Sequence, residues 1–392
     1  MPSLAVTRIG MVSALGLDAS TSCAAARAGL SRIVETDELF VDDLRGEELA
    51  PVPVHRVPRV SAGLFGFARL LQLGLAALAD LERAAPASRD GRTGLVLLVG
   101  DGRYLEAWCR KRQRALGEAT AAAPAEAESD IVADASRGKA VHERVVKDLL
   151  ATLVARSGLD VAPGLRLTLA GGASALVAAL KQAGEWLQRR ECDRCLVGGI
   201  DSLIDATVLA ALEGLGLLRT PNRAVGMLPG EAAGFLMLER PADVEARREP
   251  AAAVVVGEAA ASEAGHPLLE AASAPRDGLR AAIAEAIAQL PDRGAATALA
   301  VANLNGDSYR AESWGRNTLR TIPPLGVGAL PLWVPPLHFG DVGAATGPLA
   351  LAMLARGWAR GYAPRPGALV CLLDDAGARG AICVRAPEEL AA

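Results

Sequence analysis

The turn at residues 170–174 is where this sequence would most readily hold a catalytic nucleophile. Leu165–Leu169 is an apolar strand, Ala170-Gly171-Gly172-Ala173-Ser174 is a turn of small residues, and residues 175–189 are predicted to form a helix. A turn between a strand and a buried helix directs one side chain toward the positive end of the helix dipole, which activates a nucleophile. Gly172 takes this place and supplies no reactive atom.

The elements around this turn occur twice in the chain. The first unit ends with a strand at 195–200, and the second has a strand at 332–334, a turn at 340–345 and a strand at 368–373. Both helices are apolar on nearly all sides, as expected for helices buried between sheets. The repeat predicts an α/β protein of two similar halves in α/β/α/β/α layers. A charged linker at 241–250 divides them into residues 1–240 and 241–392.

The segments between these units are less uniform. Residues 61–85 and 138–157 are predicted helices, and residues 93–99 are a predicted buried strand. Residues 110–136 begin with a basic run and continue with Ala, Pro and Glu, without apolar periodicity. We expect an irregular insertion there. The basic run is interpreted as a solvated helix end.

Composition restricts the class of protein. The chain has 392 residues, 51% hydrophobic and 22% charged, with a formal net charge of −4, which argues against binding to nucleic-acid phosphates. No apolar run reaches the roughly 18 residues of a membrane span, and no signal peptide is evident, so a cytoplasmic protein is expected. Six cysteines are too few for a disulfide framework, and Cys192 and Cys195 lack further ligands. No metal and no cofactor are predicted.

Four stretches resemble β-ketoacyl synthases. Residues 170–176 resemble the cysteine-containing turn of these enzymes, with Gly172 at the position of the nucleophile. Residues 6–16 resemble their opening strand, residues 191–199 the strand that follows the nucleophile helix, and residues 230–239 the strand that closes their first half. The resemblance implies a thiolase-like fold.

The resemblance also implies where two further catalytic groups should be. Ketosynthases use two histidines to stabilise the enolate and the developing oxyanion. Asn305, in the loop after the strand 299–302, stands at the first position, and Asp341, in Gly340–Gly347, stands at the second. Asp374-Asp375-Ala376-Gly377 replaces the loop that gates the acyl pocket. With the nucleophile also replaced, the resemblance implies a catalytically inactive protein.

Three other residues were considered for a recruited chemical role. Ser174 lies on the first helical turn, where capping of the helix is expected. His338, three residues before Asp341, could approach the site, although a lone histidine is more often structural. Cys371 corresponds loosely to a second cysteine of biosynthetic thiolases, but its apolar strand predicts an inert thiol.

Residues 307–315 are predicted to form a loop that carries a binding surface. The segment combines charges, two aromatic residues and a glycine. Aromatic and arginine side chains are frequent anchors of protein interfaces, so Tyr309, Arg310 and Trp314 are candidates for partner binding. Packing of the loop through Trp314 is the alternative.

The resemblance leaves three functions open. The chain most resembles the stand-alone degenerate ketosynthase-like proteins of type VI secretion, accessory proteins that stabilise or load an effector, through residues 303–315 and 339–348. The alternatives are a chain-length-factor-like partner of an active ketosynthase, and an acyltransferase with repurposed residues. The family also implies a homodimer or heterodimer in which the strand Leu165–Leu169 pairs across a two-fold axis. Binding to nucleic acid or to a membrane is not expected.

Overall fold

Ten strands form the sheet framework of the protein. The computed structural model describes residues 3–42, 46, 48–57, 59–84, 92–118, 125–267, 269, 276–292, 297–321 and 330–387. The strands of the first half are β1 (Leu4–Val12), β4 (Thr93–Val99), β5 (Val161–Ala170), β6 (Arg194–Ser202) and β7 (Glu231–Glu239). Those of the second half are β8 (Ala253–Ser262), β9 (Thr297–Ala302), β10 (Leu332–Trp333), β11 (Gly367–Leu373) and β12 (Ala378–Arg385).

The two halves share one strand order. The sheet runs β10-β9-β11-β12-β8-β1-β7-β6-β4-β5, so each half uses its strands in the order third, second, fourth, fifth, first. In both halves the three strands farthest from the junction are parallel and the other two are antiparallel. Pairing of Leu4–Val6 with Ala253–Val255 joins the halves. This repeat confirms the predicted duplication.

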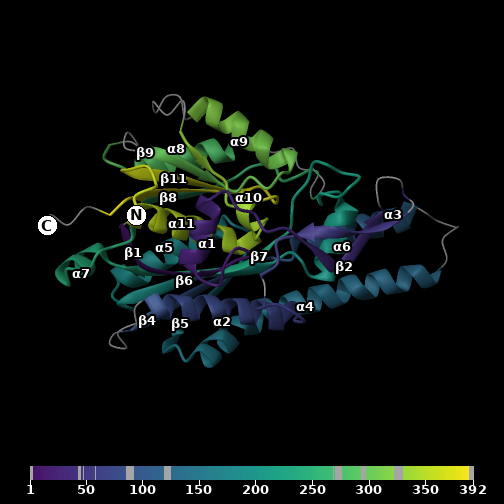
Figure 1. Cartoon of the computed structure of the whole chain (residues 1–392), viewed down its shortest axis with the longest axis horizontal. Helices are drawn as coiled ribbons and strands as arrows, with labels where there is room; N and C mark the ends of the chain where they lie inside the picture. Colours follow the sequence, from purple (N-terminus) through teal and green to yellow (C-terminus); the bar gives the residue numbers. More distant parts are fainter. Residues whose placement is uncertain are drawn as a thin grey trace.

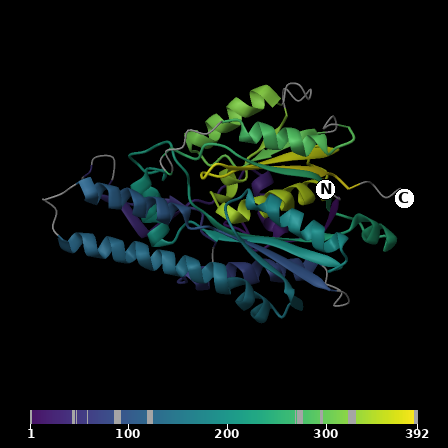
Figure 2. The same cartoon turned by 180° about the vertical axis from the view of Figure 1, so that it is seen from behind.

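Helices make the remaining layers (Figures 1 and 2). Helices α5 (Ala175–Gln188) and α11 (Thr346–Ala359) contact strands of both halves and so lie between them. Helices α2 (Gly66–Ala84) and α4 (Ala125–Ser157) cover the outer side of the first half. The outer side of the second half is covered by α8 (Gly278–Ala288), against which α9 (Ser308–Thr321) packs. The predicted five-layer α/β/α/β/α arrangement is confirmed.

Apolar packing explains why α5 and α11 were recognisable from sequence. Twelve of the residues of α11 are buried, and α5 buries Leu176, Leu180 and Leu187 along with five other residues. Both helices contribute to one core cluster that also contains residues of β1, β6, β7, β11 and β12. A helix between two sheets must be apolar around most of its circumference, which is the pattern that the sequence shows.

The predicted irregular insertion at 110–136 is wrong. Helix α3 (Arg103–Glu118) and the 33-residue α4 cover most of it, while residues 119–124 lie outside the described residues. Arg, Lys, Gln, Ala and Glu are strong helix formers, and their intrinsic propensity acts here without a clear apolar stripe. The basic run belongs to α3, which packs against α6 (Ala206–Leu215) and α4.

The predicted loop at 307–315 is also wrong, because α9 begins at Ser308. The carboxylate of Asp307 accepts a hydrogen bond from Tyr309 N (2.8 Å), which caps the first turn. Gly315 within the segment suggested a loop, but it lies inside the helix, where a side chain would meet open space. Helix α2 begins at Gly66, later than predicted. Among the described residues, no helix has the length and apolarity that crossing a membrane would require.

Candidate functional site

A cavity of about 450 Å³ opens where the carboxyl ends of strands from both halves meet. Gly100 and Asp101 follow β4, Gly172 follows β5, and Asp201 lies at the end of β6. The second half contributes three residues from strand ends and turns, namely Asn303, Asp341 and Asp374. Carboxyl ends of parallel strands are the usual place for ligand sites in α/β proteins, since the loops there are free to vary.

Gly172 lies directly against a carboxylate from the other half. A Cβ atom at this position would lie 2.4 Å from Oδ1 of Asp374, which follows β11. Asp374 therefore fills the space where a side chain at position 172 would begin. The sequence placed a nucleophile position here correctly, but it did not reveal that the space is occupied.

Asn305 and Asp341, the two other replaced positions, are in direct contact. Asn305 Nδ2 donates a hydrogen bond to Asp341 Oδ2 at 2.8 Å, and both residues are buried. Asp341 Oδ1 accepts a hydrogen bond from Gly343 N (3.1 Å) at the start of the short 3-10 helix Gly343–Ala345. The structure thus brings both predicted positions to one place, where their polar atoms bond to each other.

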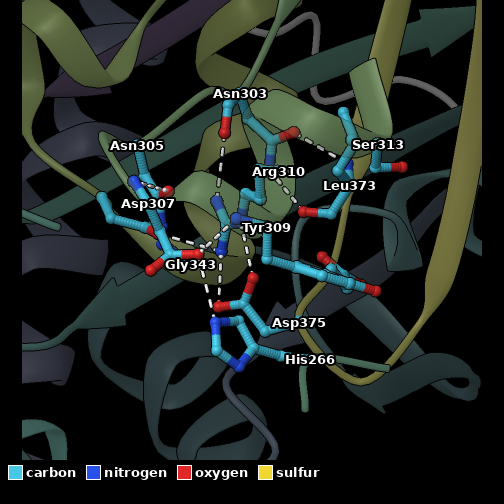
Figure 3. A network of polar contacts seen from close by, with 12 residues as sticks. His266, Asn303, Asn305, Asp307, Tyr309, Arg310, Ser313, Gly343, Leu373 and Asp375 are labelled. Atoms are coloured by element: carbon cyan, nitrogen blue, oxygen red, sulfur yellow. Dashed lines mark hydrogen bonds and ion pairs between the residues drawn. The ribbon is translucent and has the colours of Figure 1, made fainter. Parts of the chain in front are cut away.

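Arg310 joins this contact to a second carboxylate (Figure 3). Its Nη2 lies 3.0 Å from Asp341 Oδ2, and its Nε and Nη2 lie 2.7 and 3.0 Å from the two oxygens of Asp375. Nη1 donates to Asn303 O (3.1 Å), while Tyr104 Oη donates to Asp375 Oδ2 (2.7 Å). Burial alone would raise the pKa of Asp375, but the charge and hydrogen bonds of Arg310 outweigh burial and lower it to about 2.

Arg310 is therefore not a surface anchor. Its exposed fraction is 4%, because the first turn of α9 directs it into the molecule. Tyr309 also points inward: its hydroxyl donates to Ala264 O (2.5 Å) and accepts from Arg379 (2.6 Å). Trp314 is partly buried and packs on the core of the second half. The interpretation of 307–315 as a binding loop is corrected accordingly.

Asp201 and Asp374 face the cavity with neutral donors as their hydrogen-bond partners. Asp201 accepts hydrogen bonds from the backbone N–H groups of Ser202 and Ala344, both at 2.9 Å. Asp374 accepts from the backbone N–H and the hydroxyl of Ser174. Burial raises the pKa of Asp201 to about 7 against these hydrogen bonds. Burial also raises the pKa of Asp374, although the charge of Arg103 and the Ser174 hydrogen bond oppose the shift.

The three residues considered for recruited chemistry occupy different places. Ser174 stands at the N-cap of α5, but its side chain makes no capping hydrogen bond and binds Asp374 instead, so the capping prediction is wrong. His338 lies outside the cavity lining, and its Nδ1 is 3.0 Å from Leu30 O. Cys371 is buried in β11, and burial raises the pKa of its thiol well above the ordinary value.

Sequence reasoning missed the roles of Arg103, Asp201 and Asp374. A usable signal existed for the two aspartates, because each follows a run of apolar residues that was predicted as a buried strand. Parallel strands end at one edge of a sheet, so their first polar residues should converge. Arg103 follows β4 in the same way, and its guanidinium binds Asp101 through Nε (2.7 Å) and Nη2 (2.5 Å).

The described residues hold no group of three or more His, Cys, Asp or Glu side chains arranged to bind a metal ion. Cys192 and Cys195 are free, buried thiols beside β6. Their nearest use is packing, since Gly94 and Trp186 lie against them. The pair therefore contributes to the core of the first half.

Comparison with known proteins places this geometry in a family of folds. Residues 159–243 match the family model described as beta-ketoacyl synthase, N-terminal domain. This segment contains β5, the turn with Gly172, α5, β6 and β7. A search of curated proteins finds no match.

Solved structures match over nearly the whole chain. The ishigamide ketosynthase/chain length factor has a TM-score of 0.66 at 21% identity and covers 98% of this chain and 99% of that chain. An oxazolomycin ketosynthase domain of Streptomyces albus has a TM-score of 0.70 at 14% identity, covering 100% and 76%. A type II polyketide synthase ketosynthase with its acyl-carrier protein has a TM-score of 0.68 at 16% identity, covering 98% and 99%. The fold is thus the thiolase-like fold of ketosynthases.

Proposed function

We propose that this ketosynthase-fold chain is a catalytically inactive subunit that acts by binding a protein partner with the same fold, in the manner of a chain length factor beside an active ketosynthase. One observation carries the proposal. The space for a side chain at Gly172 is filled by Asp374, a carboxylate from the other half of the molecule. Covalent acyl transfer needs a nucleophile at such a place, and none fits there.

The other two replaced positions support inactivity. A condensing enzyme must offer hydrogen-bond donors or positive charge to a developing enolate or oxyanion. Asp341 offers a carboxylate, which repels such a charge, and Asn305 directs its amide N–H to Asp341. Arg310 is the remaining cation, and its guanidinium is bound by Asp341 and Asp375. The polar groups at this place satisfy each other.

The outer edge of β5 is the surface we propose for the partner. This strand is the last of the sheet, so only one of its edges pairs, with β4. The backbone along 162–164 and at Ala170 belongs to exposed residues, and Arg166–Leu169 are half-buried. An unpaired edge of this length is ready to add a strand from another chain. The matched ketosynthase/chain length factor structure is named for two such subunits.

The test combines isolation of the partner with variants at the two ends of the sheet. Tagged protein purified from its native cells should bring down, in equal amounts, a ketosynthase-fold chain with an intact catalytic cysteine. Leu167→Glu on β5 should abolish the complex. Leu332→Glu on β10, at the opposite end of the sheet, is the matched control and should leave it intact. Circular dichroism verifies that both variants fold.

The same experiment separates the alternatives. A secretion effector recovered in place of a ketosynthase would favour the accessory function in type VI secretion. Incubation with acyl and malonyl thioesters should give no change in intact mass, because no thiolate lies in the cavity. An acyl adduct would favour the acyltransferase interpretation. A complex that persists in Leu167→Glu would show that β5 is not the interface.

A further inference from the structure

The cavity contains more buried carboxylates than cations to balance them. Arg103 binds Asp101, and Arg310 binds both Asp341 and Asp375. Asp201 and Asp374 remain, each held by backbone N–H groups or a hydroxyl. A buried carboxylate without a cation nearby is costly in its ionised form. The deep end of the cavity therefore favours the entry of positive charge.

Other charged groups of the lining are already engaged. Arg69 forms ion pairs with Glu38 and Glu231 below the cavity wall. Asp205 caps α6 through Thr207 N and accepts a hydrogen bond from Gly66 N.

Two groups near the opening add no buried positive charge. Arg144 is exposed and lies over the ring of Phe67, with its Cζ 5.2 Å from the ring centre. His142 is half-buried, and burial lowers the pKa of its imidazole, which favours the neutral form. The imbalance at Asp201 and Asp374 is therefore not corrected from the wall.

Glycines leave both carboxylates uncovered. A Cβ atom at Gly100 would lie 3.0 Å from each oxygen of Asp201, and one at Gly343 would lie 2.1 Å from Asp201 Oδ2. A Cβ atom at Gly172 would meet Asp374 Oδ1 at 2.4 Å. All three glycines line the cavity, so no side chain of these turns stands between the carboxylates and the open space.

The rest of the lining is apolar. Phe65, Phe67, Leu105, Val145 and Val208 contribute to the walls, and Phe65 is 61% exposed. A cavity of about 450 Å³ is within the usual range for small-molecule sites. The described residues hold no set of three or more potential metal ligands, so the lining is unsuited to a bare metal ion. Apolar walls with an acidic end suit an organic cation.

We propose that the cavity binds an amphipathic ammonium compound, with its charged head between Asp201 and Asp374 and its apolar body against Phe65, Phe67 and Val208. The ammonium group would donate charge-assisted hydrogen bonds to oxygens that now accept from neutral groups. Apolar contact with the walls would supply the remaining affinity. This inference is independent of the proposed partner, since either can fail without the other.

Three probes of equal chain length test the proposal by titration calorimetry on the full chain. Octylamine, which is protonated at pH 7.5, should bind at least about tenfold more tightly than octanol, because a hydrogen bond to a charged group is worth about 1.5–3 kcal/mol. Octanoate should bind most weakly of the three. Equal affinity for octylamine and octanol, or no binding of octylamine, would overturn the proposal.

Variants assign the head group to its place. Asp201→Asn and Asp374→Asn should each reduce octylamine affinity by about tenfold while leaving octanol affinity within about twofold. Asp160→Asn is the control, because Asp160 is exposed and outside the cavity lining. Retention of full octylamine affinity in both cavity variants would exclude the proposed position of the head group. Circular dichroism confirms folding in each case.

Discussion

Two pairs of carboxylates meet at one cavity and are held in opposite ways. Asp341 and Asp375 share the guanidinium of Arg310, and the pKa of Asp375 falls to about 2. Asp201 and Asp374 have only neutral hydrogen-bond donors, and their pKa values rise. The burial is similar, so the partner decides the charge state. The first pair makes a fixed internal network, while the second pair remains free to take up a proton or a ligand.

Removal of Arg310 should have the largest effect. Arg310→Met leaves Asp341 and Asp375 buried without a cation, and loss of one partner of a buried ion pair typically costs about 3–5 kcal/mol of unfolding free energy. Urea denaturation measures the change. Arg316→Met is the matched control on the same helix, since Arg316 lies 3.8 Å from Glu312 at the surface. Its cost should stay within about 0.5 kcal/mol. Equal losses in the two variants would contradict the network.

Asp201 should make stability depend on pH in the opposite sense to a paired carboxylate. Its pKa is about 7 in the folded chain, so the folded state holds a proton that the unfolded chain releases near its ordinary pKa of 3.8. Stability from this group is therefore complete at low pH and decreases as pH rises from about 4 to 7. The shift corresponds to on the order of 3 kcal/mol. The backbone N–H groups of Ala344 and Ser202 and the charges of Asp341 and Asp101 face this carboxyl group.

Asp201→Asn should remove that dependence. The amide is neutral at every pH, so the variant should be more stable than the parent at pH 8 and similar to it at pH 5. Urea denaturation at the two pH values gives the comparison, and Asp160→Asn, on the surface, should leave the slope unchanged. A parent protein whose stability rises between pH 5 and 8, with a slope that Asp201→Asn does not alter, would show that Asp201 is already ionised at pH 5.

The sequence predicted the buried elements better than the exposed ones. The helices α5 and α11 and the strands β4, β6 and β11 follow from long apolar patterns, because burial imposes those patterns directly. Helix α3 was missed because it is rich in charged residues and shows no clear apolar stripe. Its helical structure depends on residue propensity and on packing against α6, which sequence reasoning did not weigh.

The site was predicted in its positions but not in its pairing. Gly172, Asn305 and Asp341 were located from their resemblance to known turns, and the structure brings them to one cavity or its border. That Arg310 turns inward follows from a helix start at Ser308 and a contact with Asp375, 65 residues later. Pairing over such a separation is decided by tertiary structure, which local sequence does not encode.

A cysteine restored at Gly172 should disturb the fold without restoring chemistry. Its Cβ atom would lie 2.4 Å from Asp374 Oδ1, so Gly172→Cys should cost about 1–3 kcal/mol of unfolding free energy, as overpacking does. The double variant Gly172→Cys/Asp374→Ala relieves the clash and should recover much of this loss. Neither protein should decarboxylate malonyl thioesters, measured by release of carbon dioxide, because Asn305 and Asp341 still offer no enolate stabilisation. Turnover by either would contradict the proposed inactivity.

The smallest effect concerns the hydroxyl that supports Asp374. Ser174 Oγ donates to Asp374 Oδ2, and this hydrogen bond, with the charges of Arg103 and Arg310, opposes the effect of burial on the carboxyl group. Ser174→Ala removes the donor and should raise the pKa of Asp374 further. Ionised Asp374 then lacks a partner, so the variant should lose about 1–2 kcal/mol at pH 8 and less at pH 5, where the carboxyl group is protonated.

Urea denaturation at both pH values checks the Ser174 prediction. Ser157→Ala serves as the control, because Ser157 Oγ donates to the backbone oxygen of Val154 and no carboxylate depends on it. Its cost should be the same at pH 5 and pH 8. A pH-independent loss in Ser174→Ala would mean that Asp374 keeps one charge state across this range. Asp374 would then belong with the fixed pair at Arg310, and Asp201 alone would remain as the adjustable group of the cavity.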